Sequence, residues 1–280
     1  MSALAGVGAL VFDMDGVLLD TSRSFTRGVL LSAAACAPPP GLQGDWTEAQ
    51  VERLRICGGF NNDWDAATAL ALLGAGTDPG PGWDAVCVEV ECRGAGVPAA
   101  QEMTGQAKWE EARSAVVPIF QALYAGPKSM EVYGVEPTCE HGLYEDEIPL
   151  VTADEIETAG LPFGIFTGRT RGEVALGLDR LGFDVPVDRL VCDTERRFRK
   201  PLPDGLLALA NALGGGTLLH VGDGVDDQLA AANARLAGLD VRFAGVAPPG
   251  SEREERFLAK GAAVVRPSLR EVLEELRRSR

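Results

Sequence analysis

The first residues of the chain that could do chemistry are two aspartates behind a short apolar run. Asp13 and Asp15 follow residues 9–12, and Gly16 comes directly after them. In an extended segment, side chains two positions apart point to the same side, and a glycine lets the chain turn away sharply. Two carboxylates placed in this way suit either metal binding or the paired work of a nucleophile and a proton donor.

Three more aspartates follow a second apolar run, residues 217–221. Asp223, Asp226 and Asp227 lie within five positions of one another. Packed carboxylates repel each other unless a cation lies among them, although Asp226 or Asp227 could instead cap the next helix. Because two aspartates follow one predicted strand and three follow another, we expect a hard cation with oxygen ligands, and Mg²⁺ is the expected ion.

Two further segments offer groups that bind anions. Thr167 and Gly168 follow the apolar run 163–166 and precede a helix-like stretch. A hydroxyl and backbone N–H groups at the start of a helix form an anion site. Lys200 is one of only four lysines and stands before Pro201, which restricts the backbone. We expect this compact cation to neutralise both a carboxylate and a phosphate oxygen.

The elements that must position these residues alternate along the chain. The apolar runs before the chemical residues have the length and composition of buried parallel strands. Weaker strand candidates are residues 189–192, 241–246 and 262–265. Amphipathic, helix-like stretches cover residues 171–181, 204–213, 226–236 and 269–278. Alternation of this kind predicts an α/β fold with a parallel sheet, in which ligands bind at the carboxyl ends of the strands.

Residues 22–125 break this alternation, because they contain helical patterns and no convincing strand. The helical patterns cover residues 47–57, 64–73 and 99–124, and two Pro/Gly-rich joints lie at 37–44 and 77–82. We therefore predict a helical domain, residues 21–125, inserted into a core made of residues 1–20 and 126–280. The return to the sheet is expected within residues 126–154.

The four motifs occur in the order D-x-D-G-V, T-G-R, K-P and G-D-G-x-x-D. This order resembles the haloacid dehalogenase superfamily over about residues 8–20 and 140–246. An insertion between the first and second motifs resembles the arrangement of subfamily I, the C1-capped phosphatases. The resemblance implies a Rossmann-like parallel α/β core with an all-helical cap. It also implies a Mg²⁺-dependent phosphatase that hydrolyses a small phosphorylated metabolite through an aspartyl-phosphate.

The resemblance gives each residue near the phosphate a role. Asp13 matches the nucleophile, and Asp15 matches the general acid/base that protonates the leaving alcohol. Thr167, with Gly168 beside it, matches the position that binds the transferring phosphoryl group. Lys200 matches the cation that holds nucleophile and phosphate together.

The resemblance also implies a set of ligands for Mg²⁺. Asp223 matches the acid that completes the metal site with Asp13 and the backbone carbonyl of Asp15. Asp227 fits the second acid of the fourth motif, and Asp226 is the alternative.

Other functions on the same fold make different demands on the sequence. Dehalogenases need no second acid in the first motif, and similar phosphonatases replace it with a small residue, so the presence of Asp15 argues against both. Two alternatives stay open. A mutase of the β-phosphoglucomutase type would return the phosphoryl group to a bound sugar, and a binding protein would keep the fold without catalysis.

The segment 58–64 is the most unusual part of the insertion, with two glycines, two amides, an acid and two aromatic residues. Asn61 and Asn62 are candidates for substrate binding. The competing interpretation is that the glycines end one helix and that Asn62 or Asp63 caps the next. His220, in the strand before the fourth motif, is expected to be a core histidine that points away from the catalytic end.

Composition excludes several classes of protein. The net charge of −15 argues against nucleic acid or an anionic membrane surface as a partner. No apolar run approaches the ~20 residues that span a bilayer. The six cysteines form no C-x-x-C pair, and the two histidines lie far apart, so a zinc site is not expected. Without a basic, apolar leader, the chain is expected to be cytoplasmic. Its oligomeric state is not predicted.

Overall fold

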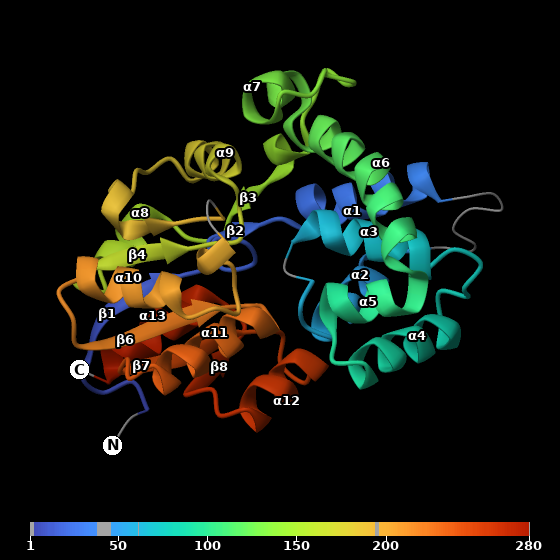
Figure 1. The fold of residues 1–280 in the computed structure, drawn as a ribbon. Coiled ribbons are helices and arrows are strands. Elements are labelled where there is room, and N and C mark those ends of the chain that lie inside the picture. Colours follow the sequence, from blue (N-terminus) through green and yellow to red (C-terminus); the bar gives the residue numbers. More distant parts are fainter. Residues whose placement is uncertain (1–2, 38–45, 61, 194–195, 280) are drawn as a thin grey trace. The chain divides into compact units, whose positions relative to one another are not determined.

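The computed structural model describes residues 3–37, 46–60, 62–193 and 196–279. The chain forms two compact units, which are coloured along the sequence in Figure 1. The first consists of residues 1–20 and 148–280, and the second of residues 21–147. The second unit is therefore an insertion in the first.

A six-stranded parallel sheet forms the centre of the first unit, in the order β5-β4-β1-β6-β7-β8. Its strands are β1 (Val7–Phe12), β4 (Phe163–Phe166), β5 (Leu190–Val191), β6 (Thr217–Gly222), β7 (Val241–Val246) and β8 (Val264–Arg266). The strands that precede three of the predicted motifs, β4, β1 and β6, are neighbours at its middle. The parallel α/β fold expected from the sequence is confirmed.

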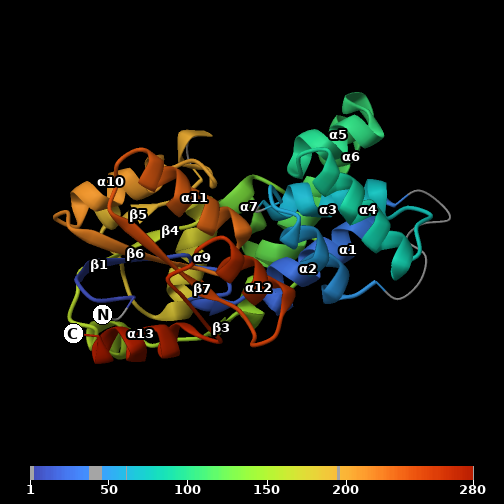
Figure 2. The ribbon, with the colours of Figure 1, turned by 90° about the horizontal axis from the view of Figure 1, so that it is seen from below.

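Helices cover both faces of this sheet. They are α8 (Ala153–Glu157), α9 (Arg171–Leu181), α10 (Asp204–Ala212), α11 (Val225–Leu236), α12 (Glu252–Ala259) and α13 (Leu269–Arg278). Side chains of β1 alternate between two hydrophobic clusters, with Leu10 and Phe12 in one and Ala9 and Val11 in the other. The first cluster includes residues of α8, α9 and α13, and the second includes residues of α10, α11 and α12. Figure 2 shows the strands between α10 and α11 on one side and α13 on the other.

The second unit contains helices and no strand among its described residues. Its elements are η1 (Ser22–Thr26), α1 (Arg27–Cys36), α2 (Glu48–Ile56), α3 (Asp63–Leu73), α4 (Pro81–Cys92), α5 (Gly96–Thr104), α6 (Gln106–Ala125), η2 (Gly126–Lys128), α7 (Ser129–Tyr133) and η3 (Leu143–Asp146). Helices α1, α3 and α6 pack against one another. The packing of α1 on α6 is close, because a Cβ at Gly28 would lie 2.8 Å from the ring of Phe120.

The second boundary of the insertion lies later than the sequence analysis placed it. Residues 126–147 belong to the helical unit rather than to the core, which resumes at residue 148. The buried carboxylate of Glu147 explains this attachment, because its Oε1 accepts hydrogen bonds from Ser24 (2.9 Å) and Tyr124 (3.1 Å). The chain returns to the core through a short antiparallel pair, in which β2 (Leu19–Asp20) meets β3 (Ile148–Pro149).

Candidate active site

Three of the predicted residues stand at the carboxyl ends of neighbouring strands. Asp13 follows β1, Thr167 follows β4, and Asp223 follows β6. The ladder continues into these positions, because the Asp13 N–H donates to the carbonyl of Val221 (2.9 Å) and the Thr167 N–H donates to that of Val191 (3.0 Å). The parallel register thus brings residues far apart in sequence to one edge of the sheet.

A buried lysine lies between two buried carboxylates at this edge. The Nζ of Lys200 is 2.8 Å from Oδ1 of Asp13 and 2.6 Å from Oδ1 of Asp227. Burial alone would lower the pKa of Lys200, but the two carboxylates outweigh it and raise that pKa above its ordinary value. The lysine is therefore a fixed positive charge next to the predicted nucleophile.

Asp227 is held in place by the start of α11. Its Oδ2 accepts a hydrogen bond from the Gly224 N–H (3.0 Å), while its Oδ1 faces Lys200 and the Nε2 of His220 (3.2 Å). Burial would raise the pKa of Asp227, but Lys200 and His220 outweigh this effect and hold the pKa below its ordinary value. Of the two acids left open by the sequence, the one that faces Asp13 across Lys200 is Asp227.

His220 is completely buried, as expected for a core histidine. The expectation that it points away from the catalytic end was wrong. Its Nε2 reaches Asp227, and its Nδ1 lies 3.2 Å from the carbonyl oxygen of Val11. Asp227 lies in the first turn of α11, which follows β6. From there its carboxylate reaches His220, a residue of that strand.

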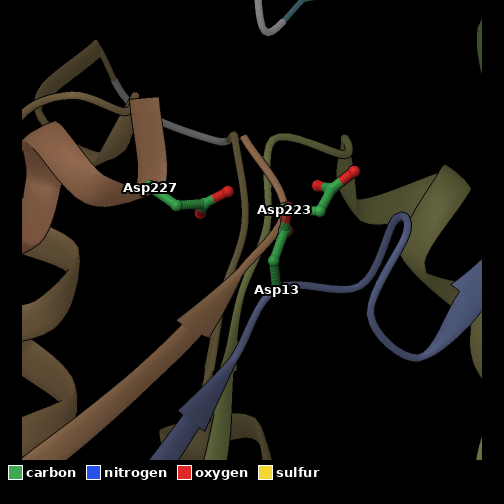
Figure 3. A group of neighbouring side chains, drawn as sticks. All are labelled: Asp13, Asp223 and Asp227. Carbon is green, nitrogen blue, oxygen red and sulfur yellow. The ribbon is translucent and has the colours of Figure 1, made fainter. Parts of the chain in front are cut away.

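Asp13, Asp223 and Asp227 form a cluster that could hold a metal ion (Figure 3). Each offers a carboxylate oxygen, and these oxygens lie within 4.8 Å of one another. Burial and the nearby charge of Asp227 raise the pKa of Asp13 well above its ordinary value, against the opposing effect of Lys200. The three acids face two cations, Lys200 and Arg253, and the excess of negative charge is one that a divalent cation would offset.

The donors of this cluster fit Mg²⁺ or a similar hard cation, because all three are carboxylate oxygens. The backbone around them leaves little freedom. Gly16 has a φ of +68°, and a Cβ at this position would overlap with the carboxylate of Asp223. Both oxygens of Asp227 contact protein groups, and binding of the ion by each of the three acids stays a prediction. The predicted contribution of the Asp15 carbonyl stays a prediction.

Two arginines that the sequence analysis left without a role pair with acids of the site. The Nε and Nη2 of Arg169 lie 2.9 and 2.6 Å from Oδ1 of Asp15. On α12, the Nη1 of Arg253 lies 2.8 Å from Oδ2 of Asp223. Arg169 stands in the T-G-R motif and could have been singled out there, whereas nothing in the sequence around Arg253 connects it with the site.

Thr167 and Gly168 lie in the connection from β4 to α9. Thr167 is buried, and its Oγ1 accepts a hydrogen bond from the Arg169 N–H (3.2 Å). Helix α9 itself begins at Arg171, four residues after Thr167, and the side chain of Thr170 caps it. The hydroxyl of Thr167 therefore lies at the strand end, and phosphoryl binding by Thr167 and Gly168 stays a prediction.

In the helical unit, the segment 58–64 serves local structure. Asn62 caps α3, because its Oδ1 accepts from the N–H groups of Trp64 (3.0 Å) and Asp65 (3.2 Å). Asp63 forms an ion pair with Arg55. These contacts favour the capping interpretation, and a substrate role for Asn62 stays a prediction. Asn61 lies outside the described residues.

In the part of the chain that the structure describes, no helix combines the length and the apolar character needed to cross a membrane. The six cysteines are all free thiols.

Comparisons with known proteins give the family and the fold that the chain resembles. A family model for haloacid dehalogenase-like hydrolases matches residues 7–235. A phosphoglycolate phosphatase of Agrobacterium fabrum is 29% identical over 124 residues, which are 44% of this chain and 53% of that protein. The match therefore spans about half the length of that relative.

Solved structures share the fold. A phosphatase of Thermococcus thioreducens has a TM-score of 0.61 at 22% identity, over 91% of this chain and 100% of that one. A HAD family hydrolase of Deinococcus radiodurans, solved with bound phosphate and sodium, has a TM-score of 0.51 at 19% identity, over 98% and 97%.

Proposed function

The chain belongs to the haloacid dehalogenase-like hydrolases, and from this premise we propose that it is a Mg²⁺-dependent phosphatase of small phosphorylated metabolites. The observation that carries the proposal is the buried group in which Lys200 lies between Asp13 and Asp227, with Asp223 beside them. A buried carboxylate next to a fixed cation and a set of oxygen ligands suits an attack on a phosphate monoester.

The charges at the site explain why each group is needed. A phosphate ester and the carboxylate of Asp13 are both anionic, so they repel each other in a buried site. Lys200 neutralises part of this charge at 2.8 Å from Asp13. When bound by Asp13 and Asp223, Mg²⁺ would supply the remaining positive charge and act as a Lewis acid.

The residues then act in two steps. Asp13 attacks phosphorus in line, the ester bond breaks, and Asp15 gives a proton to the departing alcohol while Thr167 binds the phosphoryl group. In the second step Asp15 takes a proton from water, which attacks the aspartyl-phosphate and releases the carboxylate of Asp13. Lys200 stays beside Asp13 in both steps.

We assign the helical unit the role of a cap that selects the substrate. Its support is the topology, because the chain leaves and re-enters the core at the β2–β3 pair and forms one continuous insertion between them.

The test is phosphate release from a panel of phosphorylated metabolites and p-nitrophenyl phosphate, with Mg²⁺ and with excess EDTA. Phosphoglycolate belongs in the panel, because the Agrobacterium relative is named for it. We expect release that requires Mg²⁺ and is lost in Asp13→Asn. The matched control is Asp188→Asn, which changes an exposed aspartate of the same unit. Full activity of Asp13→Asn would refute the proposed nucleophile.

A further inference from the structure

The side chain of Arg169 holds one oxygen of Asp15 from two directions. Its Nε and Nη2 lie 2.9 and 2.6 Å from Oδ1, and both bonds go to this same oxygen. Among the described residues, these are the contacts that the Asp15 carboxylate makes. The second oxygen, Oδ2, is therefore the one left for proton exchange with a substrate or with water.

Arg169 is itself fixed by its surroundings. Its side chain is only 1% exposed, whereas that of Asp15 is 28% exposed. The Nη1 donates to the carbonyl of Glu173 in the first turn of α9 (3.2 Å), and the backbone carbonyl of Arg169 accepts from the Asp193 N–H (2.8 Å). A buried arginine gains conformational order from such contacts, so it can act as a rigid support for a partly exposed partner.

Helix α9 leaves room for the side chain of Arg169 at Gly177, because a glycine has no Cβ. A Cβ at Gly177 would lie 2.6 Å from the Nη1 of Arg169 and 2.7 Å from the Sδ of Met14. Real Cβ atoms essentially never come so close to other heavy atoms, so an alanine would displace the guanidinium, Met14 or both. The buried guanidinium thus occupies a space that the neighbouring helix is shaped to provide.

We propose that Arg169 is a positioning residue for proton transfer by Asp15. The inference rests on the proposed function, in which Asp15 is the acid and base. In the first step the bond from Asp13 to phosphorus forms, the ester P–O bond breaks, and its electron pair on the leaving oxygen takes the proton from Oδ2 of Asp15. In the second step the water oxygen bonds to phosphorus, the acyl P–O bond breaks, and Oδ2 takes back a proton from that water.

The role predicts a loss that depends on the leaving group. An alkoxide leaves poorly without a proton, whereas p-nitrophenolate leaves readily without one. In Arg169→Gln, we expect kcat/KM for an alkyl phosphate to fall about 10–100-fold, as part of the 10²–10⁴-fold that a general acid contributes. For p-nitrophenyl phosphate, we expect kcat/KM to stay within about threefold. A merely structural role would lower both values alike.

Three further variants keep the test independent of one substitution. Arg169→Lys should recover part of the loss, because lysine keeps the charge but lacks the planar fork. Gly177→Ala should show the same selectivity with Arg169 and Asp15 still present. The matched control is Arg180→Gln, an exposed arginine of the same helix, which should behave as the wild type. In an Asp15→Asn background, Arg169→Gln should cause no further loss on the alkyl phosphate.

The outcomes separate this inference from the function on which it rests. If Asp13→Asn is inactive on both substrates while Arg169→Gln lowers both by the same factor, the positioning role is overturned and the phosphatase stands. If Asp13→Asn keeps its activity, both the positioning role and the proposed function are refuted. If Arg169→Gln does not fold, Arg169→Lys and Gly177→Ala decide, and an equal loss on both substrates in these variants overturns the positioning role.

Discussion

The replacement Lys200→Met tests whether the buried charges at the sheet edge depend on one lysine. Methionine keeps an unbranched apolar stem beside Phe166, over whose ring Lys200 now lies (5.2 Å), and removes only the charge and its donors. Asp13 and Asp227 would then face each other as buried acids without their common cation. We expect the folded core to lose stability and the enzyme to lose phosphate release.

The magnitude follows from the geometry. Removing one partner from a buried ion pair costs about 3–5 kcal/mol, because the remaining charge stays desolvated. Lys200 contacts two carboxylates at 2.8 and 2.6 Å, and the side chains of Lys200 and Asp227 are both fully buried. Solvent therefore screens this interaction very little, and the whole range applies. An exposed ion pair would be worth only about 0–1 kcal/mol.

The assay is urea unfolding at pH 7, followed by far-ultraviolet circular dichroism. Hydrogen exchange of peptides from β1 and β6 would show whether the loss is local to the core. The control is Lys260→Met, at an exposed lysine, for which we expect a change within about 0.5 kcal/mol. A loss below about 1 kcal/mol in Lys200→Met would refute the argument, since it would mean that the pair is screened as a surface pair is.

Three other variants probe the metal cluster, the helix cap at Asn62 and the pH dependence of stability. Gly16→Ala should abolish the thermal stabilisation by Mg²⁺, because its Cβ overlaps with Asp223, while Gly6→Ala, also at positive φ but with nothing within 4 Å, should keep it. Asn62→Ala should cost about 1 kcal/mol in urea unfolding through the lost cap and leave kcat/KM unchanged, and a large fall in kcat/KM would favour substrate binding instead. The pKa of Asp227 is lowered on folding, so its contribution to stability is present above its unfolded pKa of about 3.9 and is lost as the pH falls through the folded value. Stability of the wild type should therefore fall between pH 4 and more acidic values, and Asp227→Asn should show a shallower fall; equal slopes would contradict this assignment.

The sequence carried enough information to predict the fold class, because the central strands are buried on both faces. β1, β4 and β6 are short apolar runs that end at chemical residues, and they were expected at these positions. The weaker candidates 189–192 and 262–265 correspond to β5 and β8. A parallel strand that is covered on both faces reads as a near-continuous apolar run, and such a run marks β1, β4 and β6.

The end of the insertion could not be predicted in the same way. Residues 126–147 carry no strand pattern and only short helices. Neither the alternation of a strand nor the periodicity of a helix therefore indicates where they pack. They stay with the helical unit because Glu147 meets Ser24 and Tyr124. Ser24 and Glu147 are more than a hundred positions apart, and a local sequence pattern cannot indicate a contact over that distance.

At the site, too, local spacing indicated some residues, whereas others were found only from tertiary contacts. Its acids occur in short motifs, where close spacing and a following glycine indicate chemistry. The pairing of these acids is not visible in the motifs: Asp15 pairs with Arg169 of the T-G-R motif, which is 154 residues away, and Asp223 pairs with Arg253, which is 30 residues away. His220 was assigned correctly to the core, but the direction of its side chain was wrong, because strand alternation alone gives no information on where the next helix turns back.

These partners also reconcile the strongly acidic chain with an anionic substrate. A net charge of −15 repels phosphate at long range, and four aspartates at the sheet edge would add to that repulsion. Each of them faces a positive or donor group: Asp13 and Asp227 share Lys200, Asp15 has Arg169, and Asp223 has Arg253. The motif acids alone would suggest a strongly negative pocket. Once their partners are included, most of this charge is balanced within the fold, and the acids that remain in excess are those of the cluster that suits a divalent cation.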